Sequence, residues 1–272
     1  MIKKPIIEGT FYPKEKQRLV KMLDEFFQKA EENKFEVKAK KLFAIIAPHA
    51  GYVFSGQTAV NIYQMVKKYE YKTAIIVAPS HYSTVCEFFV GNYEAIETPF
   101  GLMQTNQEMI KKLLSKKDFC FDPSVDLREH SLDIHLPILH YIDPDIKVVP
   151  ILFVKQSNAN AKILCDYLKD LINDDTLLII STDLSHYYKS TVAKQKDSLL
   201  IENIKNFDLE SLKVNLSKRK VEACGFGGIL TLLELLKSYD NVEIDHLSYT
   251  HSGMTTNDHK QVVGYLSCGF YK

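Results

Sequence analysis

The amino-acid sequence predicts an α/β fold: a single domain over residues 1–272 with a central, mostly parallel or mixed sheet flanked by helices. Short apolar runs at 42–47, 74–78 and 177–180 are rich in β-branched residues and do not alternate with polar ones. Such runs are typical of strands buried on both faces of a sheet. Helical patterns separate these strands, and no linker or composition break divides the chain.

The N-terminal elements follow from apolar spacing and helix-start signals. Apolar residues at helical intervals predict an amphipathic helix over 14–32 that Pro13 opens. The first buried strand is expected at 42–47. Ser55 is a candidate N-cap for the next helix, because a serine hydroxyl can accept a hydrogen bond from a free N–H of the first turn. The second buried strand is expected at 73–78.

Two local motifs follow the second strand. Residues 87–90 and 93–96 flank Gly91-Asn92 and resemble a β-hairpin. Thr105 and Glu108 have the spacing of a capping box, which predicts a helix that continues to about residue 117. The C-terminal half is predicted to contain helices over 132–142, 159–173, 191–207 and 224–239, and strands over 148–154, 177–181, 242–249 and 261–271.

Histidines follow the first two buried strands. His49 and His81 each come after a strand and a proline, and 32 residues with one helix separate them, the size of a βαβ unit. Because such units are right-handed with parallel strands, both histidines are expected at one sheet edge. Ligands of open α/β sheets bind at the carboxyl ends of the strands. His49 and His81 are therefore predicted to bind one metal ion.

Asp183 and His186 follow the strand at 177–181. A carboxylate and an imidazole at this spacing can form an acid–base pair in which the aspartate orients the histidine. The alternative is an N-cap aspartate beside a surface histidine.

Cys224 lies in a glycine-rich turn that opens an apolar helix, where a helix N-terminus stabilises the thiolate as ligand or nucleophile. The alternative is a buried, inert cysteine. The cysteine count is odd and no CxxC motif occurs, so neither a disulfide framework nor a zinc ribbon is expected. The other four cysteines are expected to pack in strands or helices: Cys86, Cys120, Cys165 and Cys268.

Further polar residues are expected near the same edge. Glu129 and His130 precede a predicted helix and are candidates for substrate binding, together with Tyr52. His135 lies on a different face of that helix. Among the remaining histidines, His251 is a weaker site candidate, His140 is expected to be structural, and His246 and His259 are expected on the surface.

The composition excludes some classes of partner. Lys+Arg and Asp+Glu are both 34, so no general attraction to nucleic acid or to an anionic membrane is expected. The N-terminus does not look like a signal peptide, and no apolar run approaches the ~18 residues of a membrane span. A cytoplasmic location is the expectation.

Several motifs together resemble the Memo family, whose prokaryotic members are also called AmmeMemoRadiSam system protein B. They occur in order as Pro48-His-Ala-Gly-Tyr52 with Ser55-Gly56, Pro79-Ser-His81, Glu129-His-Ser131 with Leu136-Pro137, Thr182-Asp-Leu-Ser-His186 and Ala223-Cys-Gly225. The resemblance covers nearly the whole chain, from Gly9 to the last strand.

The resemblance implies a metal site. The Memo fold is similar to class III extradiol dioxygenases, which hold nonheme iron(II) with two histidines and a glutamate. By this likeness His49 and His81 match metal ligands, Cys224 replaces the glutamate, His186 matches an acid–base histidine and Asp183 the aspartate beside it. Iron or copper is implied, with zinc as an alternative. A thiolate is softer than a carboxylate and oxidisable, so ring-cleaving activity does not follow.

Three functions are consistent with these residues. The first is metal-dependent redox chemistry on an unknown substrate, in a pathway that the family name links to a radical-SAM protein and an AMMECR-type domain. The second is a non-catalytic module that binds a peptide or small molecule in the same cleft, because animal Memo proteins are linked to signalling and cell motility. The third is a cysteine hydrolase with Cys224 as nucleophile, His186 as base and Asp183 orienting it.

Overall fold

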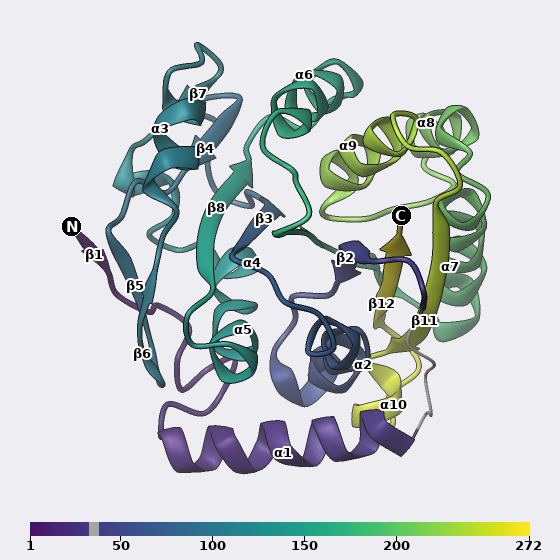
Figure 1. Cartoon of the computed structure of the whole chain (residues 1–272). Helices are drawn as coiled ribbons and strands as arrows, with labels where there is room; N and C mark the ends of the chain where they lie inside the picture. Colours follow the sequence, from purple (N-terminus) through teal and green to yellow (C-terminus); the bar gives the residue numbers. More distant parts are fainter. Residues whose placement is uncertain (33–37) are drawn as a thin grey trace.

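The computed structural model describes residues 1–32 and 38–272. Its strands form a nine-stranded mixed sheet and a three-stranded sheet, with helices on both sides of the larger one (Figure 1). The prediction of an α/β fold is therefore confirmed. The larger sheet has the order β10-β12-β2-β9-β3-β8-β4-β7, with β11 paired to β12, and the smaller has the order β1-β5-β6.

The strands have the following bounds: β1 Ile2–Lys3, β2 Leu42–Ala47, β3 Thr73–Pro79, β4 Phe88–Val90, β5 Ala95–Thr98, β6 Gly101–Gln104, β7 Phe119–Cys120, β8 Lys147–Phe153, β9 Thr176–Ser181, β10 Asp183–Tyr188, β11 Glu243–His251 and β12 Val262–Tyr271. The helices are α1 Lys16–Glu32, α2 Gln57–Val66, α3 Gln107–Leu114, α4 His130–Asp133, α5 Leu136–Ile142, α6 Asn158–Lys169, α7 Ser190–Lys205, α8 Leu209–Ser217, α9 Phe226–Leu236 and α10 Gly253–Thr256. A π-helical turn η1 covers Tyr52–Gly56, and a 3-10 turn η2 covers Pro123–Val125.

The four central strands run parallel in the order β2, β9, β3, β8, as the buried apolar runs predict. Ala47 at the end of β2 pairs with Ser181 at the end of β9, and Pro79 of β3 pairs with Phe153 of β8. The carboxyl ends of these strands therefore meet at one edge. This register places the loops after β2, β3 and β9 side by side.

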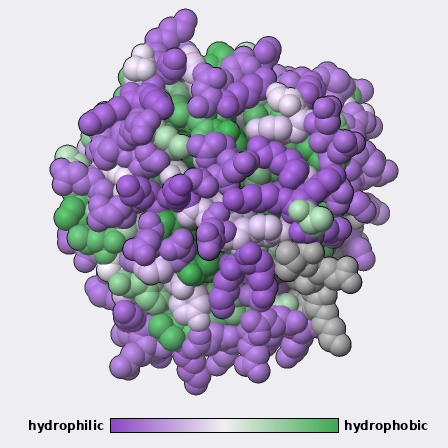
Figure 2. Space-filling model, in the orientation of Figure 1, coloured by the Kyte–Doolittle hydropathy of each residue, from purple (hydrophilic) through white to green (hydrophobic). Residues whose placement is uncertain are grey.

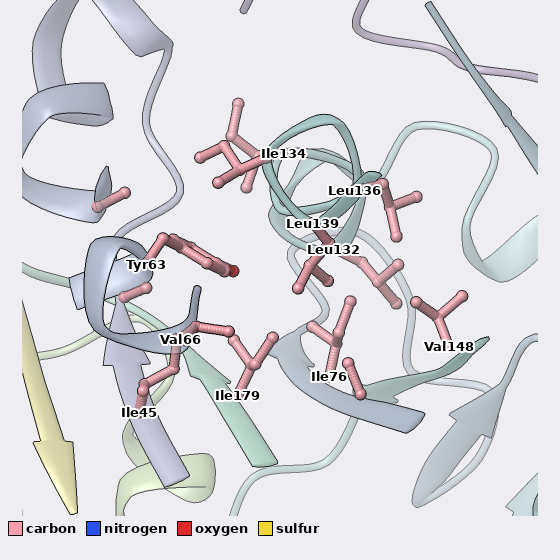
Figure 3. Close-up of a cluster of buried hydrophobic side chains, with 14 of the residues drawn as sticks. Ile45, Tyr63, Val66, Ile76, Leu132, Ile134, Leu136, Leu139, Val148 and Ile179 are labelled. Atoms are coloured by element: carbon pink, nitrogen blue, oxygen red, sulfur yellow. The ribbon is translucent and has the colours of Figure 1, made fainter. Parts of the chain in front are cut away.

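Every residue of β2, β3 and β9 is buried, because helices cover both faces of the sheet. On one face, α1, α2 and α5 cover residues such as Ile45, Ile76 and Ile179. Figure 3 shows this layer, with Tyr63 of α2 and Leu139 of α5 packed over the strands. On the other face, α6, α7, α8 and α9 cover the intervening side chains, and Figure 1 shows the same two layers.

The predicted hairpin around Gly91-Asn92 is wrong. β4 pairs antiparallel with β8 in the larger sheet, whereas β5 pairs with β1 and β6 in the smaller one. The turn signal was local, but tertiary partners direct the two strands into different sheets. β10 and α8 are additional elements that no sequence pattern predicted.

Two predicted caps are also wrong. Ser55 lies within η1, and its hydroxyl donates to the carbonyl oxygen of Ala50 rather than capping α2. Asn106 caps α3 by accepting from the Met109 N–H, while the Thr105 hydroxyl donates to the carbonyl oxygen of Tyr93. Each hydroxyl donates to a backbone carbonyl that precedes it in the sequence, five residues before Ser55 and 12 before Thr105, so neither accepts from the helix that follows.

The helix predicted over 132–142 is two short helices, α4 and α5. Pro137 lies in the first turn of α5, where its missing N–H leaves no hydrogen bond unmade. His135 lies at the junction between α4 and α5 and is 1% exposed. The break at the proline thus allows a histidine to enter the core beneath the sheet edge.

Cys86 and Cys120 form a disulfide, contrary to the expectation that both simply pack in secondary structure. Cys86 lies in the loop between β3 and β4, and Cys120 ends β7. The bond joins the loop that follows His81 to the segment that leads toward Glu129.

Hydrophilic side chains predominate on the face in Figure 2, where apolar residues form small, separate patches. Among the described residues, no helix is both long and apolar enough to cross a bilayer.

A buried ionic cluster ties β1 to the segment before α5. The Lys3 ammonium donates to both Asp133 carboxylate oxygens, at 2.8 and 2.7 Å, and lies 3.9 Å from Asp126 Oδ2. The Tyr93 hydroxyl donates to Asp126 Oδ1 at 2.9 Å. Burial raises the pKa of Asp126 to about 6, and the neighbouring Lys3 only partly offsets it. The cluster thus holds two carboxyls around one ammonium.

Asp126→Asn should therefore be more stable than the wild type at neutral pH, and the difference should grow as the pH rises. The folded-state pKa of Asp126 lies above the unfolded value of about 4, so ionisation costs the native state stability as the pH rises through 6. The variant should gain up to about 3 kcal/mol over wild type at pH 7–8 and nothing below pH ~4. Urea unfolding across pH measures this, with exposed Asp240→Asn as the control. A gain independent of pH would contradict the assignment.

Candidate metal centre

His49 follows β2 and is 1% exposed. Its backbone N–H donates to Asp183 Oδ1 at 2.8 Å. Its ring Nδ1 lies 2.7 Å from the Ser181 hydroxyl, and its Nε2 lies 3.1 Å from Cys224 Sγ. His49 is therefore held at three points, and Nε2 faces the turn that carries the cysteine.

His81 follows β3 and is held by Glu129. Its backbone N–H donates to Glu129 Oε2 at 2.6 Å, and its Nδ1 lies 2.8 Å from Glu129 Oε1. Glu129 itself is 1% exposed and also accepts from the Ser131 N–H. The carboxylate thus occupies Nδ1 and leaves Nε2 of His81 free for a ligand. Metal-binding histidines commonly have such a carboxylate partner.

His130 opens α4 and completes a group of three histidines. Its ring stacks on that of His81 with the centroids 4.9 Å apart, and the His49 ring lies edge-on at 5.4 Å. One nitrogen from each of His49, His81 and His130 lies within 4.8 Å of the other two. Among the described residues this is the group of ligand atoms close enough to share one ion.

Cys224 lies at the edge of this group. The Asp183 N–H donates to its Sγ at 3.0 Å, and its own N–H donates to the carbonyl oxygen of Asp183 at 3.1 Å. Gly225 follows where a side chain would clash with the end of β9. Burial and the Asp183 carboxylate raise the pKa of the Cys224 thiol well above its usual range. The thiol is therefore protonated until a cation replaces its proton.

The charge states of the imidazoles differ. Burial lowers the pKa of His49 far below its ordinary value and lowers that of His130, so both rings are neutral. Burial also opposes the charged form of His81, yet the hydrogen bond and charge of Glu129 outweigh it and raise its pKa. Two neutral imidazoles, a third paired with a carboxylate, and a thiol form a donor set suited to iron, copper or zinc. Magnesium and calcium prefer oxygen ligands.

The predicted Asp183–His186 pair does not form. The Asp183 carboxylate binds the backbone of His49, and burial raises its pKa to about 7. His186 instead has Nδ1 2.7 Å from the carbonyl oxygen of Leu184, and burial lowers its pKa. The charge of His81 lowers the pKa of His186 further, whereas those of Glu222 and Asp197 raise it.

Tyr52, a predicted substrate-binding residue, is 2% exposed and donates its hydroxyl to the carbonyl oxygen of Ile134. Tyr52 also contributes to the lining of a recess of about 640 Å³, and a second recess, of about 800 Å³, lies on the outer side of the Cys224 turn. Tyr188, Glu222, Ala223 and Phe226 contribute to its wall. Its lining includes Ala223 and Phe226, on either side of Cys224 in the sequence, but neither Cys224 itself nor any of the three histidines.

Sequence reasoning missed three contacts of the site. His130, a substrate-binding candidate from the sequence, also belongs to the histidine group, Ser181 contacts His49, and His135 contacts Ser181. A polar residue, Ser181, at the end of an otherwise apolar strand could have indicated a contact with the site. His246, predicted on the surface, is 3% exposed, and its Nδ1 lies 2.6 Å from the Tyr271 hydroxyl. His140 is structural as predicted, with Nδ1 2.7 Å from the Thr98 hydroxyl.

The sequence profile of Memo-like proteins matches residues 3–269. The chain belongs to the Memo family. Its relatives include MEMO1 family proteins from Aquifex aeolicus, 32% identical over 99% of both chains, and from Caldivirga maquilingensis, 30% identical over 99% of both. A MEMO1 family protein from Thermotoga petrophila is 32% identical over 98% of this chain and 99% of its own.

Membership in the Memo family confirms the resemblance that the strand-end motifs indicated. Those motifs are the segments that converge at one sheet edge: Pro48–Tyr52 after β2, Pro79–His81 at the end of β3, Glu129–Ser131 at α4, and the turn before α9. In this member of the Memo family, they enclose the three histidines and Cys224.

Proposed function

We propose that this Memo-family protein binds one iron or copper ion, with zinc as an alternative, and uses it for redox chemistry on an unknown small substrate. The proposal rests on one observation: the ligand atoms of His49, His81 and His130 lie within 4.8 Å of one another. Cys224, in contact with His49 Nε2, is the proposed thiolate ligand.

Each residue of the site has a proposed role. A bound redox metal would supply electron transfer to or from a substrate. Glu129 orients His81 through Nδ1, and Asp183 fixes the backbone of His49. His186 is neutral near the group and is proposed to accept or donate a proton, without the aspartate partner first expected. The recess lined by Ala223 and Phe226 is the proposed entry for substrate.

A non-catalytic binding module is the second candidate, since the same recess would hold a small molecule or peptide without chemistry. A cysteine hydrolase is less favoured. Cys224 contacts His49 rather than His186, and burial keeps its thiol protonated. A pathway link to a radical-SAM protein and an AMMECR-type domain remains part of the proposal, as does action in the cytoplasm.

Metal analysis tests the proposal. Protein purified without oxygen or an affinity tag should contain near-stoichiometric iron or copper by elemental mass spectrometry. His49→Ala and His81→Ala should remove it, because each deletes a ligand, whereas His259→Ala replaces an exposed histidine outside the group and should not. Absence of metal from the wild type, with none taken up on reconstitution, would rule out the metal site and leave the binding module.

A further inference from the structure

The fully buried hydroxyl of Ser181 makes three contacts at the end of β9. It donates to the carbonyl oxygen of Ser131 at 2.7 Å. It also lies 2.7 Å from Nδ1 of His49 and 2.8 Å from Nε2 of His135. Ser181 reaches His49 because β9 and β2 are paired neighbours, with Ala47 opposite Ser181.

The directions of these hydrogen bonds follow from counting protons. A carbonyl oxygen can only accept, so the Ser131 contact uses the single proton of the Ser181 hydroxyl. The hydroxyl oxygen then has only lone pairs to offer the two imidazoles. His49 must therefore donate from Nδ1 and His135 from Nε2.

The second ring nitrogen of His135, Nδ1, also has a hydrogen-bond partner that agrees with this assignment of protons. Burial lowers the pKa of His135 to about 3, so the ring is neutral and carries one proton. With that proton on Nε2, Nδ1 is an acceptor, and the Tyr63 hydroxyl lies 2.9 Å away to donate to it. Tyr63, His135, Ser181 and His49 thus form a chain in which each donor finds an acceptor.

We propose that Ser181 is a positioning residue that holds His49 in the tautomer protonated on Nδ1, with the lone pair of Nε2 directed at the centre. His81 has the matching arrangement, because Glu129 accepts from its Nδ1. Both rings would then present Nε2 before any ion arrives. The effect on metal binding rests on the proposed function, whereas the tautomer does not.

Nitrogen NMR of metal-free, ¹⁵N-histidine-labelled protein tests the tautomer directly. The signals that His49→Ala removes identify His49, and they should be those of a protonated Nδ1 and a bare Nε2. A wild-type His49 that carries its proton on Nε2 would overturn the proposal, and this result needs no Ser181 variant to fold.

Ser181→Ala tests the consequence. The variant should populate the other His49 tautomer and weaken binding of Co²⁺, used as the probe, by about 10–100-fold. Ser267→Ala is the matched control, because Ser267 is also fully buried in a strand and its hydroxyl has no hydrogen-bond partner among the described residues. Equal Co²⁺ affinity and an unchanged tautomer in both variants would overturn the positioning role.

The two proposals fail differently. If wild-type His49 carries its proton on Nδ1 but the protein binds no metal, the proposed function is refuted. The role of Ser181 in setting the His49 tautomer would then still stand. A wild type that binds metal with the opposite tautomer would refute the role of Ser181 alone.

Discussion

Lys3→Met should lower the free energy of unfolding by about 3–5 kcal/mol at pH 7.5, because it leaves two buried carboxyls without their cation. Lys3, Asp126 and Asp133 are each 7% exposed or less. Lys3 donates to both Asp133 oxygens and is the sole cation that the structure pairs with Asp133 within the described chain. The loss should shrink at lower pH, since burial raises the pKa of both carboxyls and protonation removes their charge.

Lys4→Met is the matched control for this prediction. Lys4 pairs with Glu97, but its side chain is 75% exposed. Exposed ion pairs contribute about 0–1 kcal/mol, so the control should change stability little. Urea denaturation of both variants at pH 7.5 and pH 5 gives the comparison. Equal losses for Lys3→Met and Lys4→Met would show that the buried cluster does not stabilise the fold.

Gly225→Ala should destabilise the protein by about 3 kcal/mol and abolish metal uptake, because overpacking against backbone leaves no room to relax. A Cβ at Gly225 would lie 2.3 Å from the carbonyl oxygen of Ser181 and 2.8 Å from Cβ of Thr182. The turn would have to move away from β9, and Cys224 would move with it. The contact between Cys224 Sγ and His49 Nε2 would be lost.

Gly228→Ala, three residues along the same motif, is the control. Its Cβ would meet only side chains, those of Ile180 at 3.0 Å and Val77 at 3.6 Å, and alanine favours a helix interior by about 1 kcal/mol over glycine. Stability should change by no more than about 1 kcal/mol, with metal uptake intact. Urea unfolding and Co²⁺ titration measure both effects. A Gly225→Ala protein that binds Co²⁺ as the wild type does would show that Cys224 tolerates displacement.

The central strands were predictable because the sequence pattern that identifies each of them lies within the strand itself. An apolar run such as Leu42–Ala47 identifies a doubly buried strand, and a βαβ spacing then brings His49 and His81 to one edge. The hairpin at Gly91-Asn92 failed because its two strands have stronger partners far away in the sequence. Local turn chemistry does not report which sheet a strand joins.

The candidate site was predictable in part for the same reason. His49, His81 and Cys224 follow or precede regular elements, so the topology alone brings them close. The contacts of Glu129 with His81 and of Ser181 with His135 cross 48 and 46 residues and depend on where α4 ends. Asp183 and His186 both lie in β10, which begins at Asp183. In this strand the Asp183 carboxylate accepts from the backbone of His49, and the His186 ring has a different partner.

The Cys86–Cys120 disulfide has a consequence for the entropy of the chain. His81 and Glu129 must meet across 48 residues of sequence. The disulfide lies between them and shortens the covalent path to about 15 residues, which reduces the loop-closure cost by roughly 1 kcal/mol. In the unfolded chain the imidazole and its carboxylate partner are thus already kept near each other. The intervening segment, from β4 to β7, becomes a closed ring that can vary in length without changing the distance between them.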